Sequence, residues 1–71
     1  MTSTLKIEKR NKEVAEKLDT INYIIKSAPT KVKAFERLRD ILSSDIKLGY
    51  GGSHIWCANQ KNERLFIITG Y

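Results

Sequence analysis

The sequence contains one cysteine, one histidine and one proline, and it has no long apolar run. A single cysteine cannot form an internal disulfide bond, and one cysteine with one histidine is too little for a zinc site. No segment approaches the roughly 18 apolar residues that a membrane-spanning helix needs, and the N-terminal residues lack the apolar core of a secretory signal. We therefore expect a cytoplasmic protein that does not enter a membrane and holds no metal or cofactor.

The chain is short and moderately basic. Its 71 residues are enough for one small domain, residues 1–71, and 41% apolar with 30% charged residues is a composition that folds. Lysine and arginine outnumber aspartate and glutamate by 13 to 8, which gives a net charge of +5. This excess favours an acidic partner such as nucleic acid, but a charge of this size also serves solubility, so it does not decide the function.

Apolar residues recur at helical spacing in the first third of the chain and predict an amphipathic helix over about residues 4–27. Asn11 takes the one position of the repeat that is not apolar. The stripe packs on the protein's own sheet or, as the less favoured alternative, forms a short intermolecular coiled coil. Its members are Ile7, Val14, Leu18, Ile21 and Ile25.

A second amphipathic helix is predicted over about residues 30–44. Pro29 separates it from the first helix, because proline lacks an N–H and disfavours helical dihedral angles at the residue before it. Its apolar face consists of Val32, Phe35, Leu38 and Leu42. With so short a connection, the two helices should form an antiparallel or steeply crossed pair.

The C-terminal part of the chain is rich in β-branched and aromatic residues and predicts an antiparallel hairpin, with strands over about 54–59 and 64–69. A short third strand near 46–48 is a further expectation. Two helices followed by a hairpin make the predicted fold class α+β.

Large apolar side chains stand on both faces of the predicted hairpin. With the turn centred near Lys61, Trp56 lies opposite Phe66, and His54 lies opposite Ile68. Two helices cover one face of a small sheet, so the other face is free to meet a partner. The predicted partner-binding residues are Trp56, Phe66, Ile68, His54 and Tyr50. In the alternative interpretation this face is the core, and the loop around Tyr50 partly shields the opposite one.

No combination of residues predicts catalysis. His54 and Cys57 are close in sequence, but residues three apart in a strand point to opposite faces, so the imidazole cannot take the proton of the thiol. The glycine-rich segment 49–53 precedes a strand, whereas a phosphate-binding loop precedes a helix. We therefore expect a protein that is not an enzyme.

Two functions are compatible with these patterns. The first is a small protein-protein interaction module, a regulator or inhibitor of the kind carried by phages and mobile elements, which occupies a surface on another protein and forms a homodimer. The alternative is a DNA- or RNA-binding protein, because two helices and a hairpin resemble, in element order, part of a winged-helix domain. Its nucleic-acid-binding residues would be Lys31, Lys33, Arg37, Arg39, Lys61 and Arg64.

Overall fold

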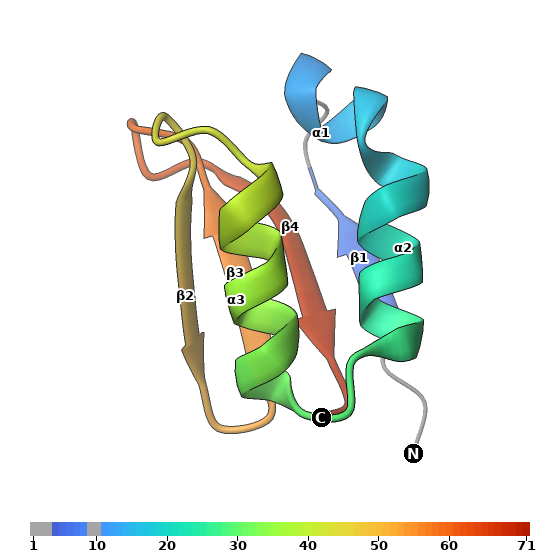
Figure 1. Cartoon of the computed structure of the whole chain (residues 1–71). Coiled ribbons are helices and arrows are strands. Elements are labelled where there is room, and N and C mark those ends of the chain that lie inside the picture. The colour runs from blue at the N-terminus through green and yellow to red at the C-terminus, as the bar shows by residue number, and fades with distance from the viewer. Residues whose placement is uncertain (1–3, 9–10) are drawn as a thin grey trace.

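The computed structural model describes residues 4–8 and 11–71, in which three helices accompany one four-stranded antiparallel sheet (Figure 1). The elements follow in the order β1 (Thr4–Ile7), α1 (Lys12–Glu16), α2 (Leu18–Ser27), α3 (Lys31–Ile41), β2 (Lys47–Gly51), β3 (His54–Ala58) and β4 (Arg64–Thr69). The α+β prediction is confirmed, and the predicted third strand is longer than 46–48.

The sheet and the helices form two layers. The strand order is β1-β4-β3-β2, so β1 and β2 are the edges. Helices α2 and α3 lie together on one side of the sheet, with α3 over β2 and β3 and α2 toward β1 (Figure 1). This arrangement covers one face of the sheet, and no helix of the described residues covers the other.

The core lies between these two layers. From the helices it takes Val14, Ile21, Ile24, Ile25, Ala34, Leu38 and Leu42, and from the sheet mainly Ile55, Cys57, Leu65, Phe66 and Ile68. Most of these side chains are almost completely buried, and each large one contributes roughly 1.5–3 kcal/mol by leaving water. Burial against the helices thus decides which face of the sheet is inside.

The start of the predicted first helix is wrong. Residues Thr4–Ile7 form β1, which pairs antiparallel with β4 from Thr4 opposite Thr69 to Ile7 opposite Phe66. The alternation in Thr-Leu-Lys-Ile suits a strand, because it places Leu5 and Ile7 on the helix side and the other two residues on the open side. Ile7 therefore belongs to the sheet and not to a helical stripe.

Asn11 begins the first helix instead of filling a gap in an apolar stripe. Its side-chain oxygen accepts a hydrogen bond of 3.2 Å from the N–H of Val14, and this is the usual way to cap a helix start. The helix is then interrupted at Lys17, whose φ and ψ of −106° and 12° separate α1 from α2. The predicted continuous helix is therefore two helices preceded by a strand.

The break before the second predicted helix is confirmed. Helix α2 ends at Ser27, with Ala28 in an extended conformation before Pro29. Thr30 then caps α3, because its hydroxyl accepts from the N–H of Lys33 at 3.2 Å. Helix α3 ends at Ile41, three residues before the predicted end at residue 44.

A β-bulge sets the register of the β3–β4 hairpin. Ala58 pairs with Arg64, but Cys57 pairs with Phe66, so Leu65 is the additional residue in β4. An extra residue changes which side chains of the two strands share a face. The prediction of Trp56 opposite Phe66 and His54 opposite Ile68 is wrong for this reason, since their partners are Ile67 and Thr69.

Candidate interaction surface

The face of the sheet away from the helices, which we call the open face, is formed by rows of residues that cross the strands. The central row is Lys6, Ile67, Trp56 and Gly49, and the next row is Thr4, Thr69, His54 and Gly51. A third row contains Lys47, Ala58 and Arg64. Apolar side chains therefore stand in the middle of the open face and basic side chains at its border.

Trp56 is the largest side chain on the open face. It is partly buried, and a Cβ atom placed on Gly49 would lie only 2.1 Å from its Cζ2 atom, so the indole covers this glycine. The ring thus extends from β3 over β2, toward the free edge of the sheet. A side chain at position 49 would displace it, which makes Gly49 a necessary part of the surface.

The structure separates the five predicted partner-binding residues. Trp56 and His54 share the open face, whereas Phe66 and Ile68 are 0% exposed in the core beneath the helices. The expectation that Phe66 and Ile68 stand beside Trp56 is wrong, because the bulge at Leu65 moves them to the other face.

Tyr50, the fifth residue of the set, lies on the helix side of β2. Its ring packs edge-on against the ring of Phe35, with 4.8 Å between the ring centroids, and 47% of the residue is exposed.

Ile67 belongs to the open face, although the register predicted from the sequence places it on the opposite one. It pairs directly with Trp56 and is partly buried. The bulge that brings it there has no local marker such as glycine in its sequence, Arg64-Leu65-Phe66. The alternation of buried residues in the two strands would have been the signal for this register, but it is hidden because every side chain from Leu65 to Ile68 is apolar.

The six residues of the predicted nucleic-acid surface are dispersed. Lys31 at the start of α3 donates to the carbonyl of Gly52 in the β2–β3 turn. Lys61 is in the β3–β4 turn, where its neighbour Gln60 donates to the carbonyl of Asp45 in the loop that follows α3. The 11 residues of α3, a length of about 16 Å, separate these ends.

Several of the six already have intramolecular partners. Lys33 lies 3.7 Å from Glu36, and Arg64 lies 3.7 Å from Glu8. Arg39 lies over the ring of Phe35 at 5.4 Å. The two ion pairs reduce the positive charge that the helix and the hairpin turn can offer to a phosphate chain.

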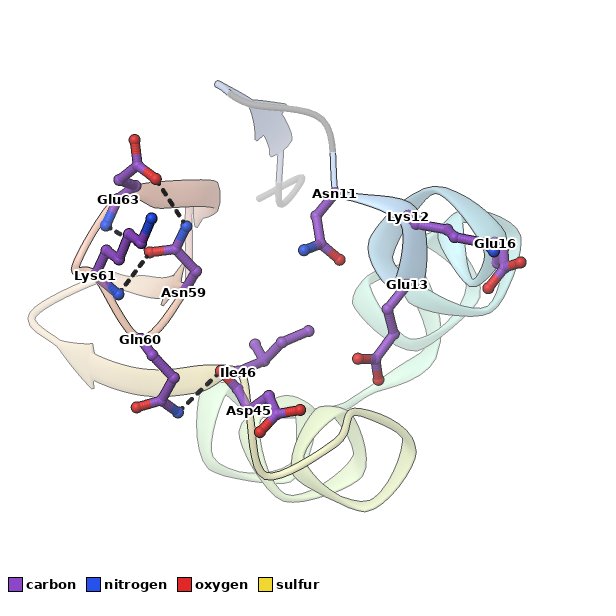
Figure 2. A pocket seen from close by; sticks show the side chains of 10 residues that line it. All are labelled: Asn11, Lys12, Glu13, Glu16, Asp45, Ile46, Asn59, Gln60, Lys61 and Glu63. Carbon is purple, nitrogen blue, oxygen red and sulfur yellow. Dashed lines mark hydrogen bonds between the residues drawn. The ribbon is translucent and has the colours of Figure 1, made fainter.

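A polar cleft of about 530 Å³ lies between α1, the loop before β2 and the β3–β4 turn (Figure 2). Figure 2 shows carboxylates and amides around it, and several of them hold the surrounding loops. Gln60 donates to the carbonyls of Ser44 and Asp45, at 3.2 and 2.9 Å. The side-chain oxygen of Asn59 accepts from two backbone N–H groups of its own turn. Gln60 thus joins two loops, and Asn59 holds the shape of its own turn.

Glu13, on the α1 side of the cleft, holds α1 against the end of α3. Its two carboxylate oxygens accept from the N–H and the hydroxyl of Ser43, both at 2.7 Å, and Lys17 donates to it at 3.2 Å. The hydrogen bonds from Ser43, side chain first, lower the pKa of the Glu13 carboxyl, with a smaller contribution from Lys17. Lys17 also donates to the carbonyl of Ile41 at the end of α3. We call this arrangement the Glu13–Ser43 clasp.

The thiol of Cys57 is enclosed in the core. The residue is 0% exposed, and burial, with a smaller effect from the charge of Glu13, raises its pKa to about 12. His54 is on the opposite face of the sheet, as predicted, since residues 54 and 56 alternate with 55 and 57. The two side chains therefore cannot act as a nucleophile and its base.

Residues 4–8 and 11–71 contain no group of three or more histidine, cysteine, aspartate or glutamate side chains that could hold a metal ion. None of the helices in the same ranges has the length and apolar character required to cross a bilayer.

No family model, curated protein or solved structure matches the chain. Its function therefore has to be argued from the surface itself.

Proposed function

We propose that the protein is a non-enzymatic protein-binding module and that the open face of its sheet is the contact surface. The observation that carries this proposal is the central row, in which Trp56 and Ile67 lie side by side on a face that no described helix covers. Tryptophan is enriched among the residues that dominate interface energies, above all where it lies at the centre of a patch with a polar border.

The border of the open face indicates the chemistry of the partner. Lys6, Lys47 and Arg64 occupy register positions around the apolar centre, and the whole chain carries +5. A protein surface with an apolar recess and an acidic rim would complement this arrangement. By filling such a recess in the cytoplasm the module would act as a regulator or inhibitor, and we further propose that it works as a homodimer.

Nucleic acid is the second candidate, supported by the net charge of +5. The open face favours protein, because two of its three cationic side chains already have partners. Lys47 donates to Asn62 at 3.0 Å, and Arg64 lies beside Glu8. Binding to nucleic acid would weaken steeply as salt rises, since each phosphate contact releases counterions.

The test uses photo-crosslinking followed by titration. A crosslinking amino acid is placed at position 67, on the open face, or at position 23, where Tyr23 is 70% exposed on α2. A protein captured from position 67 and not from position 23 is then purified and titrated against the wild type, Trp56→Ala and the control Tyr23→Ala. All three must show the same circular dichroism.

We expect Trp56→Ala to weaken binding by about 2 kcal/mol, or roughly 30-fold, and Tyr23→Ala to leave it unchanged. Equal affinities of the wild type and Trp56→Ala would refute the assignment of the open face. Binding to single-stranded or duplex oligonucleotides that falls steeply with salt, without any protein partner, would replace the proposal by the nucleic-acid function.

A further inference from the structure

Strand β2 forms an edge of the sheet, and among the described strands only β3 pairs with it. Gly51 and His54 flank a two-residue turn, in which Gly52 has φ of +53°, and the pair beside such a turn is hydrogen-bonded. Because bonded and non-bonded pairs alternate in an antiparallel ladder, the N–H and C=O groups of Leu48 and Tyr50 point away from β3, to the free edge.

This edge lacks the protection that edge strands usually have. Natural proteins place charged side chains, proline or bulges on an edge to prevent pairing with another chain. In β2 the only charged residue is Lys47, and its ammonium group donates to Asn62 of the β3–β4 turn. The rest of the strand is Leu-Gly-Tyr-Gly, paired with β3 in regular register.

A largely apolar stripe on α3 and its C-cap runs beside the same edge. Val32, Phe35 and the C-cap residue Leu42 follow the spacing of one helix face, with Arg39 among them. Between this stripe and β2 lies a groove of about 460 Å³. Its lining is apolar at Phe35, Leu42, Ile46 and Leu48 and polar at Arg39, Ser43 and Ser44. Val32 is 44% exposed and Tyr50 47%, so apolar surface continues from the helix to the strand.

We propose that β2 binds β2 of a second copy of the chain, antiparallel, across a two-fold axis at Gly49. Leu48 of each copy then lies opposite Tyr50 of the other and exchanges both backbone hydrogen bonds with it, which uses the groups that point outward. The two Gly49 residues form the close, non-bonded pair on the axis, where the absence of a side chain leaves room for the Trp56 indoles. Two four-stranded sheets become one continuous sheet.

Charge and shape favour a second copy as the occupant. Lys47 would lie opposite Gly51, so no like charges meet across the strands. Phe35 contacts Tyr50 and lines the groove with Leu48, which places the middle of α3 level with Gly49. The two α3 helices would therefore run antiparallel with their stripes facing, and Arg39 of each copy would lie level with Val32 of the other.

The experiment measures molar mass by light scattering and amide hydrogen exchange over a range of protein concentrations. We expect the mass to rise from 8.2 kDa toward twice that value. Over the same concentrations the exchange of the Leu48 and Tyr50 amides should slow at least about tenfold, because these N–H groups become hydrogen-bonded. High salt should not dissociate the dimer, because it screens the repulsion between two basic chains.

Two variants separate this interface from the open face. Val32→Lys, at an exposed position of the α3 stripe, should keep the protein monomeric. Tyr23→Lys, at an exposed position of α2, should still dimerise. Ile67→Ser, on the open face, should leave the dimer intact while it weakens partner binding. A monomer at all soluble concentrations would overturn the proposal, and so would a dimer in which the Leu48 and Tyr50 amides exchange as fast as in the monomer. The inference rests on the proposed homodimer, which a monomer would also refute, whereas either result would leave the binding role of the open face unaffected.

Discussion

Replacement of Glu13 by glutamine tests how strongly the Glu13–Ser43 clasp holds α1 to the end of α3. Glutamine keeps the shape of the side chain and one acceptor oxygen, so one bond from Ser43 survives. It removes the negative charge, the second acceptor and the attraction to Lys17, which is 3.2 Å away. The substitution therefore isolates the contribution of the charged carboxylate.

The expected loss follows from the geometry of the clasp. Hydrogen bonds to a charged group contribute about 1.5–3 kcal/mol, against about 0.5–1.5 kcal/mol for neutral ones. The Glu13 side chain is 25% exposed, and solvent weakens its interactions. We therefore use the low end of these hydrogen-bond energies. Glu13→Gln should lower the free energy of unfolding by about 1.5 kcal/mol at pH 7, or the melting temperature by about 6–12 °C.

The loss should depend on pH in a defined direction. The pKa of Glu13 is lowered in the folded protein, chiefly by the Ser43 hydrogen bonds. The carboxylate therefore stabilises the fold fully above the unfolded pKa, near 4.3, and this stability disappears as the pH falls through the lower folded pKa. The wild type and Glu13→Gln should thus differ most above about pH 5 and converge in acid.

Urea unfolding of both proteins between pH 2.5 and pH 7 checks this prediction. The control is Glu16→Gln, which removes a carboxylate from the same helix, at a position for which the described residues show no such clasp. We expect that control to change the free energy of unfolding by less than about 0.5 kcal/mol. A Glu13→Gln effect that is no larger than this, or that stays constant down to the lowest pH, would refute the role of the clasp.

Three further predictions concern the sheet. Phe66→Ala should destabilise the fold by about 3–5 kcal/mol and Ile67→Ala by about 1 kcal/mol, and urea unfolding in which Ile67→Ala is the more harmful would contradict the observed register. Gly49→Ala should displace the indole of Trp56, the only tryptophan, and an unchanged fluorescence maximum would show that the ring does not cover this glycine. Cys57 should react with a thiol reagent only in denaturant at pH 8, because its pKa is about 12 in the fold; rapid labelling of the native protein would contradict its burial.

Local signals in the sequence were sufficient to predict the second helix and the hairpin strands. Pro29 and the capping residue Thr30 mark where α3 begins, and the polar segment 59–63 marks the turn between β3 and β4. These elements depend on interactions between neighbours in sequence, so their patterns can be read directly. The fold class followed from the same elements.

The features that define the open face depend on distant residues. β1 is a strand because it pairs with β4, which lies at the other end of the chain. The sequence hides this strand, because Ile7 also fits a helical repeat with Val14. The bulge at Leu65 moves the side chains that follow it in β4 to the opposite face of the sheet. Every residue from Leu65 to Ile68 is apolar, so the alternation of polar and apolar residues that fixes register is missing. Trp56 lies on the face that the helices leave uncovered, but its neighbours on that face follow from the register of the strands.

The pairing of β1 with β4 also bears on how long the folded state persists. Strands β2, β3 and β4 are joined by short turns, whereas Thr4 meets Thr69 only after a loop of about 65 residues has closed. Contacts of such long range carry a high entropic cost of loop closure, so we expect β1 to pair with β4 after the local hairpins have formed. Weakening β1 would then shorten the lifetime of the native protein and hardly alter its refolding rate. When β1 detaches, the inner strand β4 becomes an edge, and a neighbouring chain could supply the missing strand in exchange.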